Sequence, residues 1–266
     1  MERLGQLRLG LALGGVLLVS AAYAADTSAF RASVGYDYTT GKYGGTQTID
    51  ETYVPFTAAY EMNDVELRVT VPYASVSGPA TIIDGTTGEF APGPGGTRSG
   101  LGDVVMGLSL YDLLRSSDAG FQLDAGAKVK FGTADESKGL GTGETDYSLQ
   151  MNGLQEFGPA ALFATAGYIW RGSPTGLHLR SVAFGSIGGD VRVADAARAG
   201  VTYGYRPAAI SGFPAVQEAS MFLAFAPTGG LTLRPYVSVG FSDSSPSWGA
   251  GVSLGWKLRV HEGEER

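Results

Sequence analysis

The residue types that carry most enzyme chemistry are scarce in this chain of 266 residues, which has no cysteine and two histidines, His178 and His261. His178 stands three residues before Ser181, and a Ser–His pair can form an acyl-transfer centre in which the imidazole activates the hydroxyl. No third residue that would orient the imidazole is identifiable. We therefore interpret His178 as an ordinary loop residue and predict no catalytic site.

Four acidic residues, Asp135, Glu136, Glu144 and Asp146, lie close together in the sequence and could supply the oxygen ligands that Ca²⁺ prefers. Carboxylates in solvated loops are commoner than calcium sites, so we predict no bound metal. The glycine-rich segment 139–143 does not match a dinucleotide-binding fingerprint, because a strand and not a helix follows it. We interpret this segment as a flexible external loop and predict no cofactor.

Charged side chains recur at alternate positions of otherwise apolar segments. In residues 121–131 every odd position is apolar, and every even position is polar, charged or glycine. A period of 2 places the two sets on opposite faces of a β-strand. The same alternation in the other segments predicts a lumen-facing position for eleven charged residues: Arg31, Asp37, Glu66, Arg68, Asp124, Lys128, Lys130, Asp146, Arg206, Arg234 and Lys257.

The segment 121–131 has the length of a strand that crosses an outer membrane. Its ten steps span about 33 Å at ~3.3 Å per residue. Tilted by ~40°, it covers roughly 25 Å, which is the height of the lipid-facing band of an outer-membrane barrel. Its apolar face begins and ends with phenylalanine. We therefore expect Leu123, Ala125, Ala127 and Val129 to face lipid, and the polar set to face water.

Repetition of this pattern predicts an all-β fold, a transmembrane antiparallel up-and-down β-barrel of about twelve strands. The eighth predicted strand has the weakest alternation, because glycines interrupt it. The predicted spans are residues 29–38, 52–61, 65–74, 102–112, 121–131, 145–154, 160–170, 181–191, 198–206, 218–226, 231–241 and 248–259.

The connections between these spans alternate between long and short, which is typical of outer-membrane barrels with external loops and periplasmic turns. The longest predicted loop covers residues 75–101 and is rich in Gly and Pro. Its segment 92–96 reads Pro-Gly-Pro-Gly-Gly, which indicates a loop without regular structure.

The first 24 residues have the pattern of a cleaved secretory signal peptide. Arg3 and Arg8 precede an apolar run over residues 9–19. The sequence Ala-Tyr-Ala follows this run at residues 22–24. The mature barrel would then cover residues 25–266, with a short polar tail from His261. Without Glu2, Arg3 and Arg8 the chain keeps 17 basic and 25 acidic residues, a net charge of −8. This acidic balance argues against a nucleic-acid partner.

Three short segments resemble the outer-membrane transporter-like family named for the MetA pathway of phenol degradation. They are Val-Pro-Tyr at 71–73, Gly-Leu-Gly-Asp at 100–103, and Lys-Phe-Gly-Thr at 130–133 followed by Gly-Thr-Gly at 141–143. The resemblance is best over residues 54–170. It implies an outer-membrane channel, with hydrophobic or aromatic compounds as solutes, and it supplies no binding-residue motif. Unlike most outer-membrane chains, this one does not end on an aromatic residue, and its last aromatic is Trp256.

The function that these patterns favour is passive passage of small solutes through the outer membrane of a Gram-negative bacterium, without catalysis. The expected partners are outer-membrane lipid, an unidentified small solute and, during biogenesis, the outer-membrane assembly machinery. One alternative is a structural or surface-interaction barrel whose lumen is closed. A second alternative is a hydrolase at the barrel rim that would use Ser181 and His178.

Overall fold

The computed structural model describes residues 6–10, 18–22, 28–116, 118–228 and 230–259. In these ranges no helix has the length and apolar character that a membrane-crossing helix needs. The only described helical element is the short 3₁₀ turn η1 (Glu136–Lys138).

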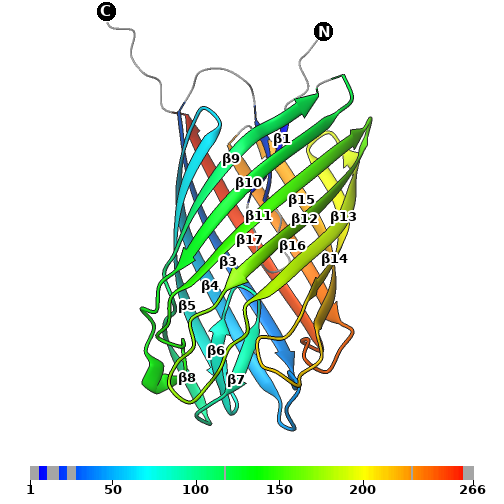
Figure 1. Cartoon of the computed structure of the whole chain (residues 1–266). Coiled ribbons are helices and arrows are strands. Elements are labelled where there is room, and N and C mark those ends of the chain that lie inside the picture. The colour runs from blue at the N-terminus through cyan, green and yellow to red at the C-terminus, as the bar shows by residue number, and fades with distance from the viewer. Residues whose placement is uncertain (1–5, 11–17, 23–27, 117, 229, 260–266) are drawn as a thin grey trace, which may run out of the picture.

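Twelve antiparallel strands form a closed up-and-down barrel, as the sequence predicted (Figure 1). Each strand pairs with the next one along the barrel, and β17 pairs with β3 to close the ring. The barrel strands are β3 (Ala29–Gly41), β4 (Ile49–Met62), β5 (Val65–Ser77), β9 (Val105–Ser116), β10 (Phe121–Lys130), β11 (Asp146–Phe157), β12 (Ala160–Trp170), β13 (Val182–Ala194), β14 (Ala197–Arg206), β15 (Val216–Thr228), β16 (Leu231–Gly240) and β17 (Trp248–Arg259).

The alternation of side chains explains why these segments become barrel strands. On β11, Leu149 is 54% exposed and the next residue, Gln150, is 4% exposed. An apolar face therefore points outward and a polar face points inward, which is the arrangement that lipid outside and a polar interior require. Aromatic residues such as Tyr147 and Phe157 stand on the outer face near the two ends of this strand.

The strand boundaries differ from the predicted ones by a few residues at both ends of the barrel. The fourth barrel strand was predicted at 102–112, but β9 begins at Val105, and residues 102–104 are not in a strand. Other strands extend two or more residues beyond the predicted spans, because ladder pairing continues there: β3, β4, β5, β11, β13 and β15. In contrast, β10, β12, β16 and β17 match the predicted spans to within one residue. The glycine-rich eighth strand, β13, pairs with β12 and β14, with one register shift between Arg192 and Ala194 on the β14 side.

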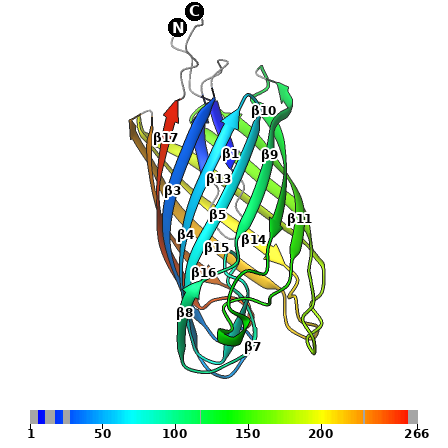
Figure 2. The ribbon, with the colours of Figure 1, turned by 90° about the vertical axis from the view of Figure 1, so that its left-hand side faces the viewer.

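The long and short connections lie at opposite ends of the barrel, as predicted. Figure 2 shows the long connections at the end of the barrel opposite the start of β3 and the end of β17. In barrels of this kind the long loops are external and the short turns are periplasmic.

The predicted external loop 75–101 contains regular structure that the sequence analysis did not predict. Residues in it form the hairpin of β6 (Ala80–Asp84) and β7 (Glu89–Pro92), followed by β8 (Thr97–Leu101), which pairs with the outer part of β5. Only residues 93–96 of the Pro-Gly segment lie outside a strand. The hairpin is a separate two-stranded sheet and contributes nothing to the barrel ladder.

Of the predicted signal segment, the structure describes two short strands, β1 (Gln6–Gly10) and β2 (Leu18–Ala22), which pair only with each other. The predicted cleavage point after residue 24 and the polar tail from His261 lie outside the described residues. The signal peptide and the division into residues 1–24 and 25–266 stay predictions.

Candidate functional site

A cavity of about 210 Å³ lies inside the outer half of the barrel. Side chains from ten of the twelve barrel strands line it, together with the turn of the β6–β7 hairpin at residues 84–88. The cavity is therefore part of the lumen, between the barrel wall and the hairpin.

The cationic part of the cavity wall is built around Gly107 of β9. In the strand register Gly107 lies opposite Arg68 of β5 on one side and opposite Lys128 of β10 on the other. A Cβ atom at Gly107 would lie 3.8 Å from Arg68 Cβ and 3.9 Å from Lys128 Cγ. Because glycine has no side chain, the space between these two cations stays open to the lumen.

Carboxyl groups line a different arc of the same cavity. Asp37 of β3 accepts a hydrogen bond from the Tyr236 hydroxyl of β16 at 2.6 Å. This bond crosses β17 at Gly251, where a Cβ atom would lie 2.4 Å from Asp37 Oδ1. Glu51 of β4 and Glu218 of β15 line the cavity as well. Gly251 thus permits a contact that any larger residue would displace.

A belt of ion pairs lies toward the periplasmic end, and we call these residues the inner belt: Arg31, Glu61, Glu66, Arg68 and Lys257. Glu61 and Glu66 face each other across β4 and β5. Arg31 forms ion pairs with both carboxylates, Arg68 binds Glu66 at 2.6 Å, and Lys257 lies 3.4 Å from Glu61. The cations offset the repulsion between the two adjacent carboxylates.

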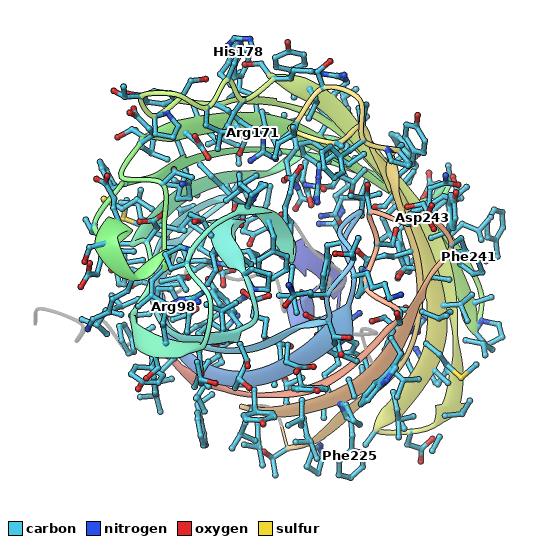
Figure 3. All side chains as sticks on the ribbon, turned by 90° about the horizontal axis from the view of Figure 1, so that it is seen from below. Arg98, Arg171, His178, Phe225, Phe241 and Asp243 are labelled. Carbon is cyan, nitrogen blue, oxygen red and sulfur yellow. The ribbon has the colours of Figure 1, made fainter. Side chains whose placement is uncertain are left out.

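At the outer end, the hairpin is attached to the barrel through Glu89. Its carboxylate lies 2.5 Å from Arg171 Nη2 and 3.4 Å from Arg206 Nε, and it accepts the Ala209 N–H at 2.7 Å. The Arg171 side chain is fully buried. Figure 3 shows Arg171 toward the interior of the ring. A buried cation of this kind needs its counter-charge, so Glu89 is the electrostatic attachment point of the hairpin.

Two apolar clusters pack against the two sides of the hairpin. On one side Ile82 and Phe90 pack with Tyr43, Val76 and Leu140. The second cluster joins Ile83 and Ala91 of the hairpin to Leu179 and Ala209 of two external loops. The hairpin is therefore packed on both sides and narrows the outer mouth of the lumen.

Arg98 of β8 fixes the base of the hairpin. Its guanidinium donates to the carbonyl oxygens of Ala80 at 2.6 Å, Lys138 at 2.7 Å, Gly78 and Gly96 at 3.1 Å each, and also Pro94. One side chain thus joins the two ends of the hairpin to the loop that carries η1. Burial lowers the pKa of Arg98, but the group keeps its charge at neutral pH.

The three motif segments that carry the family resemblance meet at one junction beside the hairpin. Asp103 accepts from the backbone N–H groups of Thr133 and Ala134 at 3.0 and 2.9 Å, and it binds Lys130 Nζ at 3.0 Å. The Gly102 N–H donates to the Pro72 carbonyl at 2.9 Å. These motifs therefore have a structural role, since they connect the start of β9 to the ends of β5 and β10.

The glycine-rich segment 139–143 is external, as predicted, but it packs against the hairpin. Leu140 is buried in the first apolar cluster, and the Gly139 carbonyl accepts from the Ile82 N–H at 2.9 Å. Gly139 has a φ of 65°, in the left-handed region that glycine adopts without strain.

The predicted lumen residues thus fall into several groups. Arg31, Glu66, Arg68 and Lys257 meet in the inner belt, and Asp37 and Lys128 line the cavity. Lys130 binds Asp146 at 3.3 Å, and Arg206 reaches Glu89.

Asp124 and Arg234 lie apart from these groups. Asp124 accepts from Gln122 at 3.0 Å. Arg234 is buried over the Phe222 ring at 4.0 Å, and its nitrogens find no acceptor among the described residues.

Sequence reasoning missed several charged groups of the lumen. Glu51, Glu61 and Glu218 occupy strand positions in phase with other inward residues. The alternation could have identified Glu61 and Glu218, whereas Glu51 lies one residue outside the predicted span 52–61. Glu89 and Arg171 stand outside the regular barrel pattern, and no periodic signal marks them.

The structure does not assemble the hydrolase pair. The Ser181 hydroxyl accepts the Arg171 backbone N–H at 3.1 Å, and among the described residues no hydrogen bond joins it to His178. Figure 3 shows His178 at the outer edge of the ring.

The four carboxylates considered for calcium are also separate. Within the described ranges no group of three or more His, Cys, Asp or Glu residues could hold a metal ion. Asp146 pairs with Lys130 and Arg171, whereas Asp135 pairs with Lys138.

Comparison with known proteins places the fold among outer-membrane β-barrels. No protein-family model and no curated protein sequence matches the chain. The structure is similar to an outer-membrane channel from Pseudomonas putida F1, with a TM-score of 0.67 and 13% identity over 89% of this chain and 97% of that chain. At this identity the similarity concerns the fold, and membership of the MetA-pathway family stays a prediction.

Two further solved structures have weaker similarity. The translocator domain of the autotransporter NalP from Neisseria meningitidis has a TM-score of 0.50 and 10% identity over 89% of this chain and 90% of that chain. The P. putida toluene transporter TodX has a TM-score of 0.46 and 9% identity over 90% of this chain and 92% of that chain.

Proposed function

We propose that this protein is an outer-membrane channel that allows small solutes to pass passively through a narrow lumen. The observation that carries the proposal is the cavity of about 210 Å³ inside a closed twelve-strand barrel, lined by polar and charged side chains from nearly every strand. Barrels of about eight strands are filled by side chains, and those of 16–18 strands hold water channels, so twelve strands fit a restricted path. The similar barrel from Pseudomonas putida F1 is itself described as an outer-membrane channel.

A second candidate is a barrel with a closed lumen that has a structural or surface role. The packing of the β6–β7 hairpin between two apolar clusters at the mouth favours this candidate. The two candidates make opposite predictions for electrical conductance across a membrane. Either role would require outer-membrane lipid around the apolar outer face and, during biogenesis, the assembly machinery that inserts such barrels.

The deciding experiment is a planar-bilayer recording from the purified, folded protein. We expect discrete conductance steps that are smaller than those of wide porins. Silent recordings from protein whose folding is confirmed by its heat-dependent gel mobility would support the closed barrel and contradict the channel. Cell fractionation of the host tests the location, and we expect recovery in the outer membrane of a Gram-negative bacterium.

A further inference from the structure

Apart from the Lys130–Asp146 pair, the charged groups of the barrel wall around the cavity are separated by sign, and Asp84 of the hairpin turn lines the cavity as well. Arg68 and Lys128 lie on the arc of the barrel from β5 to β10. Asp37, Glu51 and Glu218 lie on β3, β4 and β15, which belong to the arc that continues from β15 through β17 to β4. Cationic side chains therefore lie on one side of the lumen and carboxyl groups on the other.

Several of these groups make no close ion pair. In the part of the chain that the structure describes, Lys128 makes no hydrogen bond or ion pair, and Asp37 and Glu218 make no ion pair. Glu51 is 2% exposed, and its Oε1 atom is buried without a hydrogen-bond partner. By contrast, Lys130 and Asp146, which also line the cavity, are paired with each other. Buried charged groups normally find partners, so these exceptions require an explanation.

We propose that the cavity is a transit site for small zwitterionic solutes. The cationic group of the solute faces Asp37, Glu51 and Glu218, and its anionic group faces Lys128 and Arg68. This inference rests on the proposed channel function and specifies the chemistry of its solute. It differs from the hydrophobic or aromatic solutes that the family resemblance implies.

The separation of charge favours a zwitterion over a simple ion. A lone anion near Lys128 would meet three carboxyl groups on the other arc of the same cavity, and a lone cation would meet Lys128 and Arg68. A molecule that carries both charges can place a group of opposite sign toward each arc at once. The open space at Gly107 lets an anionic group approach Arg68 and Lys128 together.

The test is swelling of proteoliposomes in isotonic L-alanine, compared with lactamide, which is a neutral molecule of similar size. For the wild type we expect faster swelling in L-alanine than in lactamide. In Lys128→Met and in Glu51→Gln we expect the preference for L-alanine to fall several-fold, with lactamide permeation retained. Heat-dependent gel mobility confirms that each variant is folded.

Matched controls change the same charges at the exposed rim. Lys138→Met and Glu136→Gln should keep the wild-type preference, because both residues lie outside the lumen. Equal wild-type permeation of L-alanine and lactamide would overturn the zwitterion inference and leave the channel function intact. A loss of preference in the rim controls would also overturn it. Absence of permeation for both solutes, with silent bilayer recordings, would overturn the channel function and the inference together.

Discussion

The inner belt and the outer mouth are both built from buried ion pairs, but their residues come from different kinds of structure. Arg31, Glu61 and Lys257 of the inner belt stand on barrel strands, inside the continuous ladder. At the mouth, Glu89 belongs to a hairpin outside that ladder, and its partner Arg171 lies in an external loop.

Because of this difference, we expect charges in the two regions to stabilise different parts of the structure. Loss of an inner-belt charge acts on the barrel itself, because the strands that carry the belt must pair for the barrel to close. Loss of a mouth charge acts on the docking of the hairpin, since the barrel ladder remains complete without it. We therefore expect the inner belt to contribute to folding and the mouth to control access to the cavity.

The largest effect is expected from removing the hairpin. Replacing residues 79–93 with a short Gly-Ser linker should raise single-channel conductance several-fold, because the two apolar clusters that narrow the mouth lose their central members. The barrel should still fold. The matched control inserts the same linker between Gly95 and Gly96, where a Cβ atom would meet nothing within 4 Å. Unchanged conductance after the deletion would show that the constriction lies elsewhere.

Glu89→Gln tests the charge at the mouth alone. Glutamine can still accept the Ala209 N–H, but Arg171 and Arg206 lose their shared counter-charge. Removing one partner of a buried ion pair costs about 3–5 kcal/mol. We expect this cost to weaken hairpin docking, so that bilayer recordings show frequent transitions to a higher conductance level. A steady trace identical to the wild type would contradict the role of Glu89 as the attachment point.

Glu61→Gln makes the equivalent change in the inner belt. Arg31 and Lys257 lose a charge partner inside the barrel, where an unsatisfied buried group costs about 1–3 kcal/mol. We expect a lower midpoint of urea unfolding in detergent or lipid, with no new conductance transitions. If Glu61→Gln instead shows the transitions to higher conductance expected for Glu89→Gln, the proposed difference in role between the inner belt and the mouth is wrong.

The smallest effect is expected at the exposed rim pair Asp135–Lys138, whose closest charged atoms lie 3.6 Å apart. The Ser137 hydroxyl, as the largest cause, holds the pKa of Asp135 below its usual value, and Lys138 adds to this. Exposed ion pairs contribute little to stability, because water and salt screen the charges. Lys138→Gln should therefore leave both the unfolding midpoint and the conductance near wild type. A large change in either would mean that the rim is coupled to the hairpin.

Local alternation in the sequence was sufficient to predict the barrel. The run 121–131 predicted a strand with one apolar face, and eleven similar segments with alternating loop lengths predicted closure and strand number. The same phase identified Arg31, Glu66 and Lys257, which meet in the inner belt although they are far apart in sequence. It would also have identified Glu61 if every in-phase carboxylate had been included, whereas Glu51 lies one residue outside the predicted span 52–61.

The outer mouth could not be predicted in this way. The segment 92–96 correctly indicated an irregular connection, but Gly and Pro residues gave no sign of the hairpin that precedes it. Glu89 meets Arg171 and Arg206 only because the hairpin folds back between two loops that are 82 and about 120 residues away along the chain.

The sequence by itself determined the barrel strands, because the environment of their side chains alternates with a fixed period. Lipid on one side and a polar interior on the other impose a period of two on every strand, so the strand, its faces and its length are local properties. The tertiary structure alone decided which charges become partners and which are left facing the cavity. Ion pairing depends on distances of a few ångströms between segments brought together by barrel closure, and no local pattern encodes those distances.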